Sequence, residues 1–83
     1  MSGLLIKVKL FGGLVAPEGI LADKNGEYPL QLPEGATVAN LIELLSLKNK
    51  PLIVVINGII CNDYEKKINS GDIISFFPPV AGG

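Results

Sequence analysis

The sequence contains no histidine, arginine or tryptophan, and a single cysteine at position 61. Without histidine it offers neither a Cys–His or Ser–His dyad nor an ordinary zinc site. One cysteine forms no disulfide within the chain and cannot by itself hold an iron–sulfur cluster. The seven basic side chains are all lysines, and eight acidic ones outnumber them, giving a net charge of −1. This balance leaves no basic surface for a nucleic acid partner.

Long apolar segments are also absent. The longest apolar run covers residues 52–56, whereas a membrane-spanning helix needs about 20 residues. The N-terminal run at 3–6 is too short for the core of a signal peptide. We therefore expect a cytoplasmic protein with no membrane partner.

The apolar residues that are present suffice for one small domain. Hydrophobic residues make up 48% of the 83 positions, and a chain of this length forms a single core. Alternating apolar residues predict strands over residues 4–11, 28–32 and 73–77. Pro29 cannot donate a hydrogen bond to a neighbouring strand, so it favours an edge position for the second of these strands.

The middle of the chain predicts a long loop followed by a helix. Residues 12–27 contain glycine, proline and asparagine without a sustained period, so we expect a loop there. By themselves these residues assign no role to the loop. Apolar residues at helical spacing then predict a helix from Val38 to Leu47. Thr37 has the hydroxyl with which an N-cap accepts a backbone N–H of the first turn.

The order of the elements indicates the fold class. The continuous apolar run at 52–56 predicts a central strand covered on both faces, and Asn57-Gly58 favours a tight turn into a short strand at 59–61. One helix beside these strands indicates an α+β fold. If the strands at 4–11 and 73–77 pair in parallel at the centre, the arrangement is a β-grasp. This ubiquitin-like fold has a mixed sheet of four to five strands covered by one main helix.

The end of the sequence forms a distinctive tail. We divide the chain into a β-grasp domain of residues 1–77 and an extended tail, Pro78-Pro79-Val80-Ala81-Gly82-Gly83. Two prolines hold a segment extended and prevent further sheet pairing. The side chains then shrink to two glycines, a taper that lets a terminal carboxylate enter a narrow channel in another protein. The alternative is a frayed end of no function in a chain that contains ten glycines.

With these features the chain resembles the ubiquitin-like sulfur carriers of the MoaD and ThiS type, and most specifically the small subunit of molybdopterin synthase. The resemblance covers the strand at 6–11, the helix after Thr37, residues 54–58, the Ser70-Gly71-Asp72 turn and above all the sequence FFPPVAGG at 76–83. The double proline is typical of molybdopterin synthase tails rather than of thiazole carriers. The loop at 12–27 departs from the family, because many members have a short charged helix there.

The resemblance implies a chemistry centred on Gly83. A ubiquitin-activating-type enzyme (MoeB- or ThiF-like) would use ATP and Mg²⁺ to adenylate the Gly83 carboxylate. A sulfur-mobilising enzyme would then convert the adenylate into a thiocarboxylate, so that the sulfur is carried covalently on Gly83. Gly82 would give steric access.

The resemblance also implies where this sulfur goes. Pro78, Pro79, Val80 and Ala81 would enter the active site of a MoaE-like large subunit, the molybdopterin synthase large subunit. That subunit would catalyse sulfur transfer to a pterin precursor of the molybdenum or tungsten cofactor. This chain would bind no cofactor or metal and would supply no catalytic residue, so it would not itself be an enzyme.

Three alternatives stay open at the level of the sequence. A ThiS-like carrier would use the same activation for thiazole synthesis in thiamine formation. A ubiquitin-like protein tag would end in an isopeptide bond to a lysine of another protein. A non-carrier interaction module would have an inert tail.

The last strand carries two candidates for partner docking, Phe76 and Phe77. Neighbouring residues of a strand face opposite sides of the sheet. We therefore expect one ring in the core and the other exposed to a partner, without an indication of which is which.

The remaining polar and sulfur-containing residues predict structural roles. Cys61 is expected to be a small apolar filler rather than a redox site. Asp63, Glu65 and Asp72 lack the spacing of a calcium loop, so we expect them on a solvated rim. Asp72 is also expected to stabilise the turn that precedes the last strand.

Overall fold

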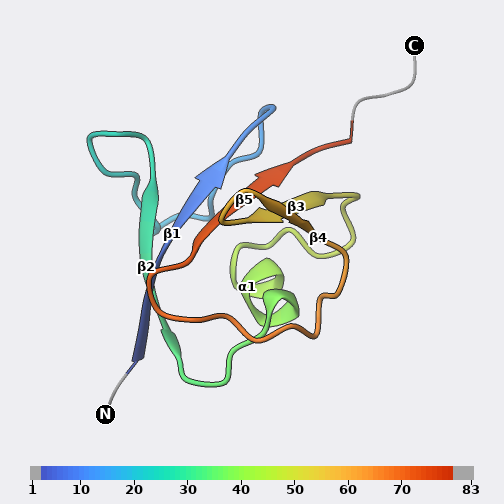
Figure 1. Ribbon diagram of the computed structural model, residues 1–83. Coiled ribbons are helices and arrows are strands. Elements are labelled where there is room, and N and C mark those ends of the chain that lie inside the picture. Colours follow the sequence, from blue (N-terminus) through green and yellow to red (C-terminus); the bar gives the residue numbers. More distant parts are fainter. Residues whose placement is uncertain (1–2, 80–83) are drawn as a thin grey trace.

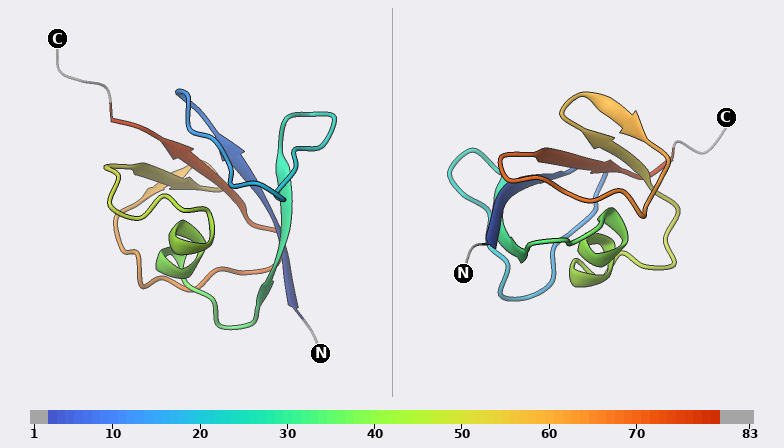
Figure 2. Two further views of the ribbon diagram at one scale, coloured as in Figure 1. Left: turned by 180° about the vertical axis from the view of Figure 1, so that it is seen from behind. Right: turned by 60° about the horizontal axis from the view of Figure 1, so that its bottom comes forward.

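The computed structural model describes residues 3–79, which form a mixed β-sheet with one α-helix against one of its faces (Figure 1). The sheet has five strands in the order β2-β1-β5-β3-β4. The elements are β1 (Gly3–Leu10), β2 (Tyr28–Pro33), α1 (Val38–Leu44), β3 (Ile53–Ile56), β4 (Ile59–Cys61) and β5 (Ile73–Phe77). Two further views show the sheet curving around the helix (Figure 2). This arrangement is the predicted α+β, β-grasp fold.

The last strand of the chain lies in the middle of the sheet. β5 pairs in parallel with β1, with Leu10 opposite Phe76, and antiparallel with β3, with Ile53 opposite Phe77. The parallel central pair expected from the sequence is therefore confirmed. Because β5 is hydrogen-bonded on both sides, the position at which the tail begins is held by the most central part of the fold.

The core lies between α1 and the inner face of the sheet. Alternate residues of the strands point towards the helix, as the pleat requires. The most deeply buried side chains are Val8, Val38, Leu41, Leu45, Leu47, Val54, Ile74 and Phe76. Removal of these side chains from water is the main favourable term in folding.

The helix is shorter than its sequence pattern predicted. α1 ends at Leu44 rather than at Leu47, and Ser46 follows with a left-handed φ of 59°. Leu45 and Leu47 are nevertheless buried, with exposed fractions of 0% and 2%. The apolar period continued because both side chains still enter the core after the backbone has left the helix.

The N-cap of α1 was predicted correctly. The Thr37 hydroxyl accepts a hydrogen bond from the Asn40 backbone N–H at 3.2 Å, and the Asn40 side-chain oxygen accepts one from the Thr37 N–H at 2.8 Å. This reciprocal pair satisfies two N–H groups that a helix start leaves without partners.

The expectation that the 52–56 strand is covered on both faces was wrong. β3 buries Val54 and Ile56 beneath the helix, but Ile53 is 38% exposed and Val55 is only partly buried. Its continuous apolar sequence therefore reflects an apolar outer surface rather than a second covering layer. The edge position predicted from Pro29 is confirmed, because β2 ends the sheet on one side.

The segment at 12–27 is a loop, as predicted, and it lies beside β1 and β2 (Figure 2). Lys7 Nζ lies 3.7 Å from an Asp23 carboxylate oxygen and 3.4 Å from one of Glu27, and Lys9 Nζ lies 3.5 Å from the other Glu27 oxygen. Asp23 also accepts hydrogen bonds from the backbone N–H groups of Glu27 and Asn25. These bonds, and the charge of Lys7, hold the pKa of the Asp23 carboxyl below its ordinary value of 3.8.

Candidate functional site

The structure assigns different roles to the two phenylalanines of β5. Phe76 is fully buried, facing α1, whereas Phe77 is partly exposed on the opposite, outer face of the sheet. The question left open by the sequence is thereby answered. Phe76 is a core residue, and Phe77 is the ring available for contact with another molecule.

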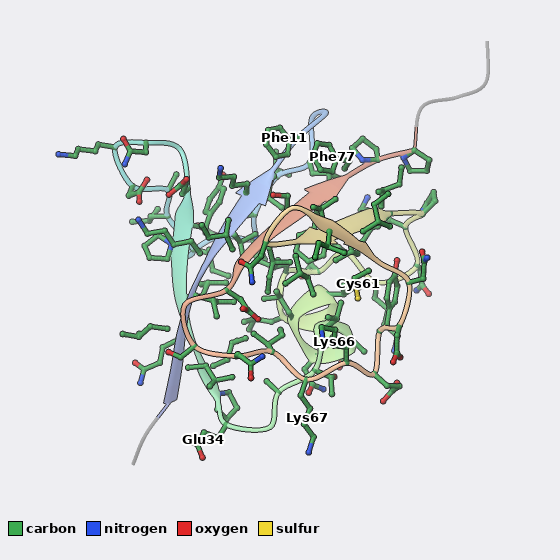
Figure 3. All side chains as sticks on the ribbon, in the orientation of Figure 1. Phe11, Glu34, Cys61, Lys66, Lys67 and Phe77 are labelled. Atoms are coloured by element: carbon green, nitrogen blue, oxygen red, sulfur yellow. The ribbon has the colours of Figure 1, made fainter. Side chains whose placement is uncertain are left out.

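Phe77 is stacked against Phe11, which directly follows β1 (Figure 3). The ring centroids lie 4.5 Å apart, and the ring planes differ by 3°. Phe11 is 41% exposed. Ile53 lies opposite Phe77 in the register with β3 and is also exposed. The side chains of Phe11, Phe77 and Ile53 therefore form an apolar row across one end of the outer face.

A second row continues this apolar surface. Val55 lies opposite Ser75 of β5 and opposite Ile60 of β4, and directly paired residues share one face of a sheet. Ile60 is 64% exposed. We call the combined surface the outer apolar patch; it consists of Phe11, Ile53, Val55, Ile60 and Phe77. Contiguous exposed apolar surface of this kind is typical of protein interaction sites.

Most of the outer apolar patch was missed in the sequence. Only Phe77 had been singled out, as one of two possibilities. A signal for Phe11 was present, since it follows Lys7 and Lys9 on the outer face of the first strand. The contributions of Ile53 and Val55 were hidden because their strand was expected to be covered on both faces.

The tail begins beside this patch. Pro78 is partly buried and Pro79 is exposed, and both directly follow Phe77. The other residues assigned to the tail from the sequence, Val80 to Gly83, lie outside the described residues. The structure therefore places the predicted docking ring and the start of the predicted tail at one end of the central strand.

One family model matches most of this chain. The model of the ThiS family matches residues 14–83, which include β5 and the tail. The chain belongs to the ThiS family of ubiquitin-like sulfur carriers. No curated protein matches this ThiS-family chain significantly.

Solved structures share its fold. A Pyrococcus furiosus protein described as molybdopterin converting factor subunit 1 is 24% identical, with a TM-score of 0.70 over 93% of this chain and 99% of that one. A complex of subunits 1 and 2 of molybdopterin-converting factor from Helicobacter pylori matches at 21% identity and a TM-score of 0.61, covering 96% and 100%. SAMP1 from Haloferax volcanii matches at 20% identity and a TM-score of 0.65, covering 95% and 99%.

At the opposite end of β5 from Phe77, Asp72 links the start of this strand to the turn between β3 and β4. One Asp72 carboxylate oxygen accepts a hydrogen bond from the Asn57 side-chain amide, and the other accepts one from the Asn69 backbone N–H, both at 2.9 Å. Asn57 in turn accepts one from the Ile73 N–H at 2.8 Å. The predicted turn-stabilising role is confirmed. The predicted solvated position is wrong, because Asp72 is only 8% exposed.

We expect Asp72→Ala to destabilise the fold by about 2–3 kcal/mol, because it leaves two donors without their charged acceptor. Urea unfolding followed by circular dichroism would measure this loss. Asp63→Ala is the matched control, since within residues 3–79 the Asp63 carboxylate accepts a single bond, from the exposed Glu65 N–H. The control should cost less than about 1 kcal/mol. Equal losses in the two variants would contradict the role given to Asp72.

Cys61 has the predicted packing position. It belongs to the core cluster with an exposed fraction of 9%, and its sulfhydryl donates to the Asp63 carbonyl oxygen at 3.3 Å (Figure 3). Asp63 and Glu65 are exposed, as predicted for a solvated rim.

Residues 3–79 contain no cluster of three or more acidic, cysteine or histidine side chains that could hold a metal ion. None of the helical segments in these residues has the length and apolarity needed to cross a membrane.

Proposed function

We propose that this chain carries sulfur as a thiocarboxylate on Gly83 and donates it in molybdopterin synthesis, as the small subunit of a molybdopterin-synthase-like complex. The observation that carries the proposal is the position of the FFPPVAGG sequence. Its phenylalanines end the central strand of a ThiS-family β-grasp fold, and its prolines begin the tail beside the outer apolar patch. The folded domain thus places the first residues of the tail next to an apolar surface.

The chemistry explains why activation is needed. A carboxylate is a poor electrophile because its leaving group would be oxide. An adenylating enzyme of the ubiquitin-activating type joins the Gly83 carboxylate to AMP from MgATP and releases pyrophosphate. The terminal sulfur of an enzyme persulfide then attacks the acyl carbon and displaces AMP. A second thiol attacks the sulfur–sulfur bond, forming a disulfide and releasing the Gly83 thiocarboxylate.

The chain offers little catalysis of its own for the transfer. It has no histidine, and its one cysteine is buried. In this proposal the general acid–base groups come from the large subunit, and the adenylating enzyme binds ATP and Mg²⁺. Support for such a large subunit comes from the similar Helicobacter pylori structure, which is a complex of subunits 1 and 2.

The outer apolar patch supplies the docking surface in this proposal. Its five side chains lie on one face, and the tail begins at its rim. The large subunit would cover this face while residues 78–83 enter its active site. Pro78 and Pro79 have no N–H group for pairing with a neighbouring strand, and β5 ends at Phe77 just before them.

Thiazole synthesis is the second candidate, and the match to the ThiS family model favours it. The double proline of the tail favours the first candidate, sulfur transfer to a pterin precursor. Complementation separates the two, since a pterin carrier restores molybdenum cofactor formation in a strain that lacks its own small subunit. Restoration of thiamine synthesis alone would overturn the first choice.

The proposed carrier function predicts a specific mass change. Incubation with ATP, Mg²⁺, a sulfur source and purified adenylating and sulfur-mobilising enzymes should replace one terminal oxygen by sulfur and add about 16 Da. Cleavage after Lys67 releases peptide 68–83, which contains neither Met1 nor Cys61. A gain on this peptide therefore cannot be oxidation of sulfur. An unchanged peptide, with enzymes active on a known carrier, would reject the proposed function.

A further inference from the structure

The junction between β5 and the tail is packed against the beginning of the 12–27 loop. The Phe11 backbone N–H donates a hydrogen bond to the Phe76 carbonyl oxygen at 3.1 Å, which extends the β1–β5 pairing beyond β1. The stacked Phe11 and Phe77 rings hold the same two segments together on the outer face. The backbone at residues 76–77 is thus fixed by its neighbour in the sheet.

Gly12 extends this contact to the first residue of the tail. Its φ is +67°, and a Cβ at this position would lie 2.5 Å from Pro78 Cγ and 2.6 Å from Pro78 Cδ. Carbon atoms make favourable contact at about 3.5–4.0 Å. The Pro78 ring therefore occupies the space that any side chain at position 12 would need.

Gly13 separates the effect of backbone strain in the loop from the effect of displacing Pro78. Its φ is +85°, also left-handed, but a Cβ there would meet no atom within 4 Å. Alanine would strain the backbone at both positions, since L-residues rarely adopt a positive φ. Only at Gly12 would it also displace Pro78.

We propose that Gly12 is a positioning residue for the activation of Gly83, acting through Pro78. The inference rests on the proposed carrier function. The proline ring includes the backbone nitrogen and restricts φ at Pro78. The position of the ring against Gly12 therefore orients the backbone where the tail begins. The five residues after Pro78 span at most about 17 Å, so a change in the direction in which they leave the domain shifts the region that the Gly83 carboxylate can reach. A misplaced reacting carboxylate reaches the productive geometry less often.

The test measures thiocarboxylate formation on the full chain as the varied substrate of the adenylating and sulfur-mobilising enzymes. For Gly12→Ala we expect kcat to fall about tenfold or more, the effect of misplacing a reacting group. KM should equal that of Gly13→Ala, because both variants place an L-residue at a positive φ and neither changes a residue of the outer apolar patch. For Gly13→Ala we expect the same kcat as for the unsubstituted chain.

The kinetic constants distinguish positioning from loss of folding. Partial unfolding lowers the concentration of competent substrate, which raises the apparent KM and leaves kcat unchanged. Any strain common to the two alanine variants therefore appears in KM. A fall in kcat for Gly12→Ala alone reports the direction of the tail.

A second variant tests whether Pro78 transmits the effect. Pro78→Ala removes Cγ and Cδ, and the remaining Pro78 Cβ position lies 4.0 Å from a Cβ at residue 12, an ordinary contact. Gly12→Ala should therefore lower kcat no further in a Pro78→Ala chain. A kcat equal in Gly12→Ala and Gly13→Ala, or an undiminished fall in the Pro78→Ala chain, would overturn the inference. If the unsubstituted chain gained no sulfur, that result would instead overturn the proposed function, and the inference with it.

Discussion

A chain lengthened by one alanine after Gly83 is expected to gain no sulfur and to support no cofactor synthesis. The terminal carboxylate would then belong to the added alanine, whose methyl group would meet the narrow channel that two glycines fit. Loss should be complete within the sensitivity of mass spectrometry on the C-terminal peptide. Complementation of a strain lacking its small subunit should fail as well.

The controls for this prediction separate a carrier from an interaction module with an inert tail. One alanine added at the N-terminus changes the length equally, and this chain should keep full activity. Binding of the lengthened chain to the large subunit should persist, because the outer apolar patch is unchanged. If the chain lengthened after Gly83 still supported cofactor synthesis, the tail would be inert and the interaction module would be the correct interpretation.

Replacing the two adjacent phenylalanines should have opposite consequences. Phe76 is fully buried in the core, so Phe76→Ala should lower the free energy of unfolding by about 3–5 kcal/mol. A chain of 83 residues has a total stability of about 4–12 kcal/mol, so the loss is a large part of the whole. Urea unfolding followed by circular dichroism would measure it.

Phe77→Ala should leave the fold largely intact and weaken docking. It removes the stacking on Phe11 and should cost about 1 kcal/mol of stability. Loss of a central aromatic contact should weaken binding to the large subunit by about 2 kcal/mol, roughly 30-fold in Kd. Titration calorimetry with the purified large subunit would measure this. An unchanged Kd, or unfolding as severe as that of Phe76→Ala, would contradict the assignment.

β4 provides a matched pair for the same surface. Ile59 and Ile60 are both exposed apolar residues, at 73% and 64%. Ile60 lies opposite Val55 on the outer face, whereas Ile59 lies opposite the buried Ile56. Ile60→Ala should therefore weaken binding to the large subunit, and Ile59→Ala should not. Equal effects would place the docking surface elsewhere.

Local sequence determined the elements and their order. Alternation marked the strands at both ends of the chain, and Thr37 marked the start of α1. These signals are readable because backbone geometry sets a period of two for strands and 3.6 for helices. The tail sequence and the element order together led to the β-grasp fold and to the carrier family that the ThiS model match shows.

Tertiary structure alone decided which side of each element became the site. Phe76 and Phe77 are equivalent by local pattern, and the covering helix buries one of them. The outer apolar patch joins Phe11, which follows β1, to side chains of β3, β4 and β5, which lie far from it in the sequence. The contact of Gly12 with Pro78 spans most of the chain as well. Such juxtapositions depend on strand order and register, which arise from packing of the whole sheet rather than from the period of any one segment.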